Sequence, residues 1–275
     1  MHQNALLFDI GGTKMRVAFS VDGQSFEAPQ SVLTPSSYEE GLKLFVDVAR
    51  RVANGRKIEA VCGGIAGPFT ERKRSLMGSP NLSDWIGKPL KNNLEENLQA
   101  PIYIENDSAL VGLGEAIFGA GKGAEIVAYI TVSTGVGGVR VVDGKIDERN
   151  LGFEPGHQII DYQNMQTLES LVSGKSVQKR FGKEPKEISD STVWTDLAKT
   201  LAVGLSNTIM HWSPQVLVLG GSMIIGNPAI PIELTERHIK EIIKIFPELP
   251  TIKKAELGDF GGLYGAMTYL KSQAH

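Results

Sequence analysis

The chain carries short glycine-rich segments in which acidic, hydroxyl and cationic side chains stand beside the glycines. The first is DIGGTK, which runs from Asp9 through Gly11 and Gly12 to Thr13 and Lys14. Glycine lets a backbone approach a ligand closely and turn its N–H groups toward an anion. Thr13 would add a hydroxyl, Lys14 a positive charge, and Asp9 could hold Mg²⁺ through water. A plain β-hairpin turn would also use glycine, but the flanking residues favour phosphate binding.

A second segment, STGVGG, repeats this plan. A shift of 121 positions places Thr13 on Thr134 and the later Asp-Gly turn at 22–23 on the one at 143–144. The matching identities are sparse, so the sequence predicts a repeat of architecture, with two unrelated hairpins as the alternative. Two Gly-Thr turns could hold one polyphosphate from both sides. The residues concerned in the second turn are Thr134, Gly135, Gly137 and Gly138.

A third glycine pair, Gly220-Gly221, follows the apolar run 215–219, where a nucleotide base or ribose could lie. Two familiar nucleotide motifs are excluded. The pattern G-x-x-x-x-G-K-[ST] occurs nowhere in the chain. Gly135 and Gly137 begin G-x-G-x-x-G, but Arg140 takes the third glycine position, and a strand is expected to follow instead of a helix. This argues against a nicotinamide-linked dehydrogenase.

The elements between these segments alternate in type. Apolar runs predict strands at 5–10, 15–21, 58–62, 102–104, 126–132, 139–142 and 215–219. Helical spacing predicts helices at 38–52, 90–98, 108–118, 194–212, 234–246 and 263–270. Alternating strands and helices indicate an α/β protein with a largely parallel sheet, whose ligands sit beyond the carboxyl ends of the strands.

Length, net charge and cysteine content exclude several classes of protein. The 275 residues suffice for one large domain or two medium ones, and the net charge of -3 shows no basic surface for nucleic acid. Cys62 is the only cysteine, which excludes an internal disulfide and a thiolate zinc site. The first twelve residues do not resemble a signal peptide, and no apolar run approaches the ~20 residues that span a bilayer. We therefore expect a cytoplasmic protein without a membrane or nucleic-acid partner.

As a set, the motifs resemble the ROK family of sugar kinases and repressors, within the actin and hexokinase superfamily. The stretches that carry the resemblance span most of the chain in the family's order: DIGGTK at 9–14, GGIAGP at 63–68, ENDSALVGLGEAIFGAG at 105–121, TVSTGVGGV at 131–139, EPGH at 154–157, LESLVSG at 168–174 and PQVLVLGGSM at 214–223. The resemblance implies a two-lobed actin-like ATPase (ribonuclease H-like) fold, each lobe a mixed sheet with flanking helices. We expect 1–107 with 262–275 as a smaller N-terminal lobe, 108–261 as a larger C-terminal lobe, and an active site in the cleft between.

The resemblance also implies roles. Asp107 would be the general base, and an N-cap of the following helix is its structural alternative. The residues implied at the sugar are Asn81, Asn106, Asp107, Glu154, His157 and Glu169. Those implied around ATP are Asp9, Gly11, Gly12, Thr13, Lys14, Thr134, Gly135, Gly137, Gly138, Gly220 and Gly221. ATP and Mg²⁺ are the expected cofactors, and a homodimer is expected from the family.

One departure from the family pattern concerns zinc. Typical members carry a run resembling C-x-C-G-x-x-G-C-L-E after the EPGH-like segment, and here 158–167 is short and has no cysteine. We predict no zinc site, and His157 inherits no zinc role. Packing by Ile159, Ile160, Tyr162 and Met165 is one substitute that could anchor the helix of Glu169.

The sequence thus predicts ATP-dependent phosphorylation of a hexose, with glucose or a close aldohexose at its 6-hydroxyl favoured. A kinase for N-acetylmannosamine or fructose is the alternative, and a sugar sensor of the same family that does not bind DNA is less favoured. A sugar-sensing repressor is disfavoured, because only eight residues precede Asp9. A pure ATPase or an acetate kinase-like enzyme stays a third class, although Glu154, His157 and Glu169 suit a polyol better than a carboxylate.

Overall fold

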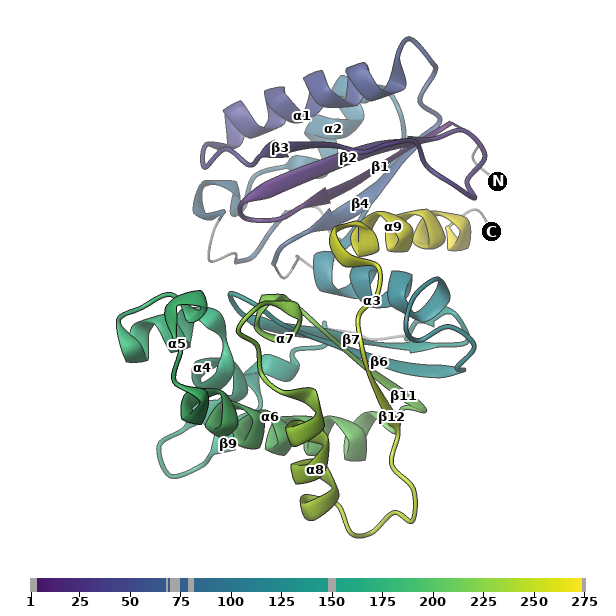
Figure 1. The fold of residues 1–275 in the computed structure, drawn as a ribbon. Coiled ribbons are helices and arrows are strands. Elements are labelled where there is room, and N and C mark those ends of the chain that lie inside the picture. Colours follow the sequence, from purple (N-terminus) through teal and green to yellow (C-terminus); the bar gives the residue numbers. More distant parts are fainter. Residues whose placement is uncertain (1–3, 68, 70–74, 79–81, 148–151, 274–275) are drawn as a thin grey trace. The chain divides into compact units, whose positions relative to one another are not determined.

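The computed structural model describes residues 4–67, 69, 75–78, 82–147 and 152–273 (Figure 1). The chain divides into two compact units. Unit 1 consists of Met1–Gly114 and Gly258–His275, and unit 2 consists of Glu115–Leu257. Helix α3 (Asp107–Ile117) therefore begins in unit 1 and ends in unit 2.

Unit 1 is built on a five-stranded mixed sheet in the order β3-β2-β1-β4-β5. Its strands are β1 (Ala5–Ile10), β2 (Lys14–Ser20), β3 (Gln30–Leu33), β4 (Ala60–Ile65) and β5 (Ile102–Asn106). The strands β1, β4 and β5 run parallel, while β2 and β3 are antiparallel to their neighbours. Every residue of β4 is buried, as expected for a central parallel strand with both faces covered.

The helices of unit 1 cover both faces of this sheet (Figure 1). Helices α1 (Tyr38–Ala53) and α2 (Leu90–Leu98) lie on one face, and α9 (Gly261–Ser272) packs against β1 and β4 on the other. Helix α9 also lies very close to α3, because a Cβ at Gly265 would stand only 1.8 Å from the carbonyl oxygen of Leu110. Glycine is thus required where these two helices meet.

Unit 2 has a five-stranded mixed sheet of its own, in the order β12-β11-β6-β7-β8. Its strands are β6 (Ile126–Val132), β7 (Val136–Val142), β8 (Lys145–Ile146), β11 (Val216–Gly220) and β12 (Thr251–Lys254). The long helix α6 (Ser191–Trp212) packs with α4 (Leu168–Val172) and α8 (Ile232–Ile242), and its buried side chains share a core with β6 and β11.

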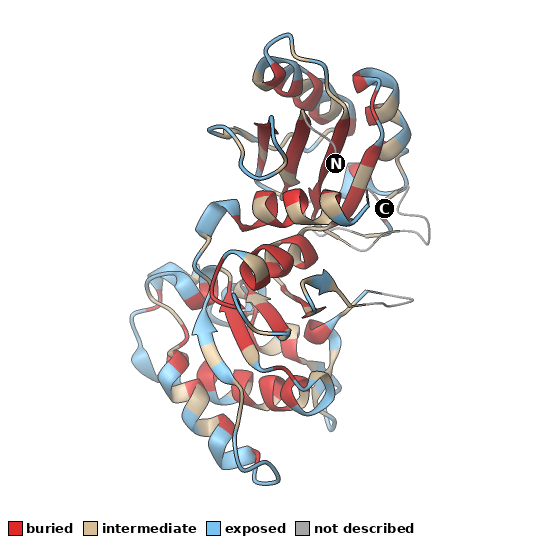
Figure 2. Cartoon of the chain, turned by 90° about the vertical axis from the view of Figure 1, so that its right-hand side faces the viewer, coloured by how far each residue is buried: buried red, intermediate tan, exposed pale blue. Residues whose placement is uncertain are grey.

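The remaining elements of the described chain are short. They are the hairpin strands β9 (Ile159–Asp161) and β10 (Gln166–Thr167), helices α5 (Gly174–Phe181) and α7 (Ser222–Ile225), and the 3-10 turns η1 (Ser83–Trp85), η2 (Pro155–His157), η3 (Pro185–Glu187) and η4 (Gly258–Phe260). Figure 2 shows that the buried residues gather on the central strands of each sheet and on the inward sides of the long helices.

The two sheets share one topology. In each, a leading strand forms a hairpin with the second, the third extends that hairpin, and two later strands join the other side of the leading strand in parallel. Strand β1 shifted by 121 residues coincides with the first six residues of β6. The predicted repeat of architecture is confirmed, as is the mixed sheet with flanking helices in each half that the resemblance implied. The largely parallel sheet expected from the alternation alone is wrong, because each sheet begins with antiparallel hairpin strands. Among the described residues, no helix is long and apolar enough to cross a membrane.

Candidate active site

The carboxyl ends of the parallel strands in unit 1 meet at one edge. Ile10, Ile65 and Asn106, the last residues of β1, β4 and β5, are successive partners across the sheet. Ligands of such sheets bind beyond this edge. The DIGGTK turn at 9–14 follows β1 there, and α3 begins there at Asp107.

The turn between β1 and β2 is held by hydrogen bonds that leave part of its backbone available. The Gly11 N–H donates to the Lys14 carbonyl at 2.9 Å, and the Thr34 hydroxyl donates to the Gly11 carbonyl at 2.8 Å. Within the described part of the chain, the N–H groups of Gly12 and Thr13 have no hydrogen-bond acceptor. The side chains of Thr13 and Lys14 are exposed. The turn therefore presents two N–H groups, a hydroxyl and a cation, which is a set suited to an anion.

Two partly buried carboxyl groups, of Asp9 and Asp107, lie beside this turn. Asp9 pairs with Gly64 across the sheet, and a Cβ at Gly64 would stand 3.0 Å from the Asp107 Cα. Burial and, next, the neighbouring charge of Asp107 together raise the pKa of Asp9 to about 7, against the opposing effect of Arg16. Burial also raises the pKa of Asp107 above its ordinary range.

Arg16 only partly neutralises this acidic pair. Its guanidinium Nη1 lies 3.3 Å from Asp9 Oδ2, and its Nη2 lies 3.0 Å from Asp259 Oδ2. Asp259 is largely exposed, so its charge is screened by water. Gly262 closes the site from α9, because a Cβ there would stand 3.0 Å from the Asp9 Cγ. The arrangement leaves negative charge that a divalent cation would offset.

The first turn of α3 settles which residue caps it. The Asn106 Oδ1 accepts from the Ala109 N–H at 3.1 Å, and the Asn106 Nδ2 donates to the Gly67 carbonyl at 3.2 Å. Asn106 is therefore the N-cap, and the alternative reading of Asp107 as the cap is wrong. Asp107 instead accepts from the N–H and hydroxyl of Ser108 through one oxygen, Oδ1, at 2.7 and 3.3 Å. Asn81 lies outside the described residues.

In unit 2, three predicted sugar-side residues gather around Val136, the first residue of β7. The Glu169 Oε2 accepts from the Val136 N–H at 2.7 Å. The η2 turn rests on the same residue, since a Cβ at Gly156 would stand 2.3 Å from the Val136 carbonyl oxygen. This turn carries Glu154 and His157, whose Oε2 and Nδ1 lie 3.3 Å apart with both side chains half-exposed or more. Carboxylates and an imidazole are thus presented together at one end of the unit 2 sheet.

The STGVGG turn, between β6 and β7, contacts the end of β11. The Ser133 N–H donates to the Gly135 carbonyl at 2.8 Å, and the Ser133 and Ser222 hydroxyls lie 3.1 Å apart. Gly221 has φ +87°, and a Cβ there would stand 2.3 Å from the Val132 carbonyl oxygen. These contacts place the segment that carries Thr134 and Gly135 beside the one that carries Gly220 and Gly221. That the two segments bind one ligand stays a prediction.

Gly137 and Gly138 lie in β7 and not in the turn itself. A Cβ at Gly138 would stand 3.0 Å from the Pro155 Cγ, so Gly138 lies beneath η2.

Gly174 was missed by the sequence reasoning, although its N–H donates to the Ser133 carbonyl at 2.7 Å and supports the turn from α5. The small residues of the VSGK segment, directly after the LE pair, were the available signal.

The stretch 158–167 forms the β9–β10 hairpin. Asp161 closes its tip by accepting from the N–H groups of Gln163 and Asn164 at 3.0 and 3.2 Å. Ile159, Tyr162 and Met165 are 47%, 78% and 66% exposed, so the predicted packing is wrong for these three. Ile160 alone packs against the unit 2 core, which includes Leu168 beside Glu169. No cluster of three or more His, Cys, Asp or Glu able to hold a metal occurs in the described ranges, and the expected lack of zinc stays a prediction.

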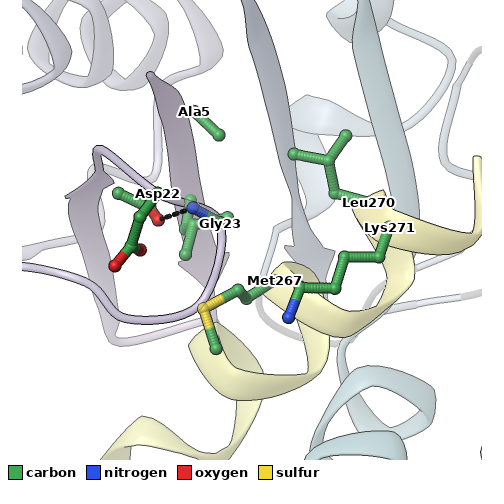
Figure 3. A pocket seen from close by; sticks show the side chains of 8 residues that line it. Ala5, Asp22, Gly23, Met267, Leu270 and Lys271 are labelled. Atoms are coloured by element: carbon green, nitrogen blue, oxygen red, sulfur yellow. Dashed lines mark hydrogen bonds between the residues drawn. The ribbon is translucent and has the colours of Figure 1, made fainter. Parts of the chain in front are cut away.

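A small cavity in unit 1 is separate from all of these residues. It lies at the far end of β1, between the turn after β2 and α9, and is lined by residues such as Ala5, Gly23 and Met267 (Figure 3). Its volume of about 10 Å³ is near the lower limit for one water molecule. This cavity is too small for a sugar or a nucleotide.

Comparison with known proteins identifies the family. The family model described as "ROK family" matches residues 6–273. A ROK hexokinase structure from Thermus thermophilus superposes with TM-score 0.82 at 26% identity, covering 99% of this chain and 100% of that one. A ROK family glucokinase from Streptomyces griseus, in complex with glucose and AMPPNP, gives TM-score 0.78 at 22% identity over 97% and 98%. An N-acetyl-D-glucosamine kinase of Mannheimia succiniciproducens is 26% identical over 94% of this chain and 96% of its own.

The chain belongs to the ROK family and has the actin-like fold of the family's kinases. The predicted family and fold are confirmed. The predicted enzyme class, a sugar kinase, is confirmed by relatives that match over nearly their full length.

Proposed function

We propose that this protein transfers the γ-phosphoryl group of ATP to a hexose, with glucose or a close aldohexose as the acceptor and its 6-hydroxyl as the site. The observation that carries the proposal is the partly buried Asp107 carboxyl at the start of α3, next to Asp9 and the DIGGTK turn. The hexokinase and glucokinase names of the relatives support the acceptor class.

In the proposed reaction Asp107 acts as the general base. The sugar hydroxyl oxygen forms a bond to the γ-phosphorus, the bond from that phosphorus to the bridging oxygen of ATP breaks, and the hydroxyl proton passes to the Asp107 carboxylate. ADP leaves with the bonding electrons. Phosphoryl transfer has a loose transition state, so positioning and charge neutralisation supply most of the catalysis. A raised pKa suits Asp107 to this role, because it makes the carboxylate a better proton acceptor.

The residues present fit the expected cofactors. Asp9 and Asp107 leave net negative charge in a buried place, which suits Mg²⁺ bound to Asp9 through water. When bound, the ion would neutralise phosphate charge and orient the polyphosphate. The N–H groups of Gly12 and Thr13 and the Lys14 ammonium would bind phosphate oxygens, and Thr134 and Gly135 would do the same from unit 2.

Glu154, His157 and Glu169 are proposed to bind the ring hydroxyls. Each carboxylate oxygen can accept from one hydroxyl, and the imidazole can donate or accept. One oxygen of Glu169 is already used by the Val136 N–H, which fixes the direction of the other. Asn106 is proposed at the sugar as well, although its amide also caps α3.

The test is ATP consumption across a panel of hexoses, including glucose, fructose, N-acetylglucosamine and N-acetylmannosamine. Asp107→Asn should lower kcat by at least about 10²-fold, because the amide cannot take the proton. Asp47→Asn, an acid-to-amide change on the exposed side of α1, is the matched control and should leave kcat unchanged. Full activity of Asp107→Asn would remove Asp107 as the base.

The panel also decides between acceptors. A preference for N-acetylmannosamine or fructose would replace glucose within the same mechanism. Turnover of none of the hexoses would reject the substrate class, and ATP hydrolysis without stimulation by sugar would indicate a pure ATPase. Sugar binding without turnover would indicate a sugar sensor.

A further inference from the structure

Gln158 follows directly after the EPGH segment and makes hydrogen bonds in three directions. Its side-chain Nε2 donates to the Pro155 carbonyl at 2.8 Å, and its Oε1 accepts from the Asn207 Nδ2 at 3.0 Å. Its backbone carbonyl accepts from the Leu168 N–H at 3.0 Å. One residue therefore joins the η2 turn, the start of α4 and the C-terminal part of α6.

Chemistry fixes the orientation of both amides. A peptide carbonyl can only accept, so Gln158 must turn its NH₂ group toward Pro155. The Gln158 Oε1 then faces Asn207, which must turn its own NH₂ group outward to donate. Neither amide can be flipped without placing two acceptors or two donors in contact. The pair is therefore a specific connection.

The two segments that Gln158 joins carry the proposed sugar-side residues. Pro155 is the first residue of η2, with Glu154 before it and His157 two residues later. Leu168 is the first residue of α4 and precedes Glu169. Asn207 belongs to α6, and its neighbours Ser206 and Thr208 are buried in unit 2. The 22-residue helix is thus the fixed support to which both segments are attached.

We propose that Gln158 and Asn207 form a positioning pair that holds the Glu154–His157 turn and the Glu169 helix in register with each other. The pair touches no substrate. It sets the sugar affinity by fixing the distances among the three recognition side chains, since displacement by about 1 Å can cost up to about 10²-fold in activity. This inference rests on the proposed function for its kinetic consequence, and on the hydrogen bonds alone for its structural one.

The kinetic test compares Gln158→Ala and Asn207→Ala with the wild type. Each should raise KM for the sugar about 10-fold while KM for ATP changes less than about 2-fold. The double variant should be no worse than either single one, because each change alone already breaks the same connection. Gln163→Ala, on the exposed tip of the same hairpin, is the matched control and should match the wild type.

A conservative variant separates the two ends of the Gln158 side chain. Gln158→Glu keeps an acceptor for Asn207 but places a carboxylate oxygen against the Pro155 carbonyl. It should resemble Gln158→Ala in sugar KM, because the link to η2 is lost in both. Equal increases of both KM values, or full additivity in the double variant, would overturn the positioning role and leave a general structural one.

Hydrogen exchange tests the inference without any activity. The amides of His157, bonded to the Glu154 carbonyl, and of Leu168, bonded to the Gln158 carbonyl, report on the two segments. Both should exchange at least about 10-fold faster in Gln158→Ala, while amides in the core of α6 keep their protection. Unchanged exchange would overturn the pair even if the enzyme proves to be a hexose kinase. Faster exchange in a protein inactive on every hexose would uphold the pair and reject the proposed function.

Discussion

Asp9 and Asp107 are two carboxyl groups that the fold of unit 1 forces together. Glycines make this possible from two sides, Gly64 beneath Asp107 and Gly262 beneath Asp9. Burial opposes the ionisation of both groups, and the charge of Asp107 adds to this effect on Asp9. Arg16 offsets only part of the effect on Asp9. In the absence of metal, the ionised site is therefore a source of instability that the folded protein retains for function.

The unfavourable ionisation of Asp9 in the folded protein predicts that the free energy of unfolding depends on pH. The folded-state pKa of Asp9 is about 7, above its ordinary value of 3.8, so the folded chain binds this proton more tightly than the unfolded chain. Stability from this group is present below about pH 4 and is lost as the pH rises toward about 7. Between pH 4 and pH 8, with EDTA present, Asp9→Asn should therefore gain on the order of 3 kcal/mol relative to the wild type.

The measurement is urea unfolding of both proteins at several pH values. Asp22→Asn is the control, because Asp22 is an exposed turn residue whose pKa is lowered by the N–H groups of Gln24 and Ser25. It should show no gain at high pH. Added Mg²⁺ should reduce the advantage of Asp9→Asn, because the ion would stabilise the ionised wild-type site. A pH-independent difference between wild type and Asp9→Asn would contradict the argument.

Elements also depend on single buried acids, and Glu115 in α3 is the clearest case. Its side chain is 1% exposed, and its carboxylate accepts from the N–H groups of Ala120, Glu256 and Leu257 at 2.8 to 3.1 Å. These donors belong to the loop that leads to β6 and to the segment after β12. Glu115 therefore holds the entrance and the exit of unit 2 together within that unit.

Replacing the Glu115 carboxylate should lower the free energy of unfolding. Glu115→Gln keeps one acceptor oxygen but turns an NH₂ group toward backbone donors, and it removes charge-assisted hydrogen bonds. We expect a loss of about 2 to 4 kcal/mol in the free energy of unfolding. Urea unfolding should show the loss, whereas Glu125→Gln, exposed in the same loop, should stay within about 0.5 kcal/mol of the wild type. Equal stability of both variants would show that the Glu115 bonds are dispensable.

The sequence predicted the elements whose apolar pattern is long. The helix expected at 38–52 is α1 at 38–53, and the one expected at 194–212 is α6 at 191–212. Short elements escaped, among them β3, β12 and the β9–β10 hairpin, because two to four residues carry too little periodicity. The helix expected at 234–246 ends at Ile242, where the chain turns toward the proline-containing segment before β12.

The candidate site was predictable where residues stand next to a strand end, as Asp9, Asp107 and the glycine turns do. Hydrogen bonds between residues far apart in the sequence could not be predicted. Gln158 and Asn207 are 49 positions apart, and nothing in either segment marks the other as its partner. The cap of α3 shows a finer limit, because Asn106 and Asp107 are adjacent and both residue types cap helices, so only the geometry assigns the two roles.

At the scale of the whole molecule, the shift of 121 positions between the two hairpins was the most productive pattern. It predicted two sheets of one topology from a few shared turn residues, because turn chemistry and strand length define a hairpin even when side chains differ. The same comparison also marks where this chain departs from the family pattern. The segment between the EPGH turn and Glu169 has no cysteine, and Cys62, the single cysteine of the chain, is buried within β4 of unit 1.

The absence of cysteines between the EPGH turn and Glu169 predicts the metal content of the chain. Hydrogen bonds from Gln158 and the Asp161 turn shape the segment where related chains are expected to bind zinc, so folding should not require that metal. Protein produced with zinc in the medium should contain less than about 0.1 zinc per chain by elemental analysis, since no thiolate set is available to bind it. A zinc-selective chelator should leave kcat and the unfolding midpoint unchanged while Mg²⁺ is in excess, whereas EDTA should abolish turnover until Mg²⁺ is restored. About one zinc per chain, lost together with stability on chelation, would mean that oxygen and nitrogen ligands replace the cysteines.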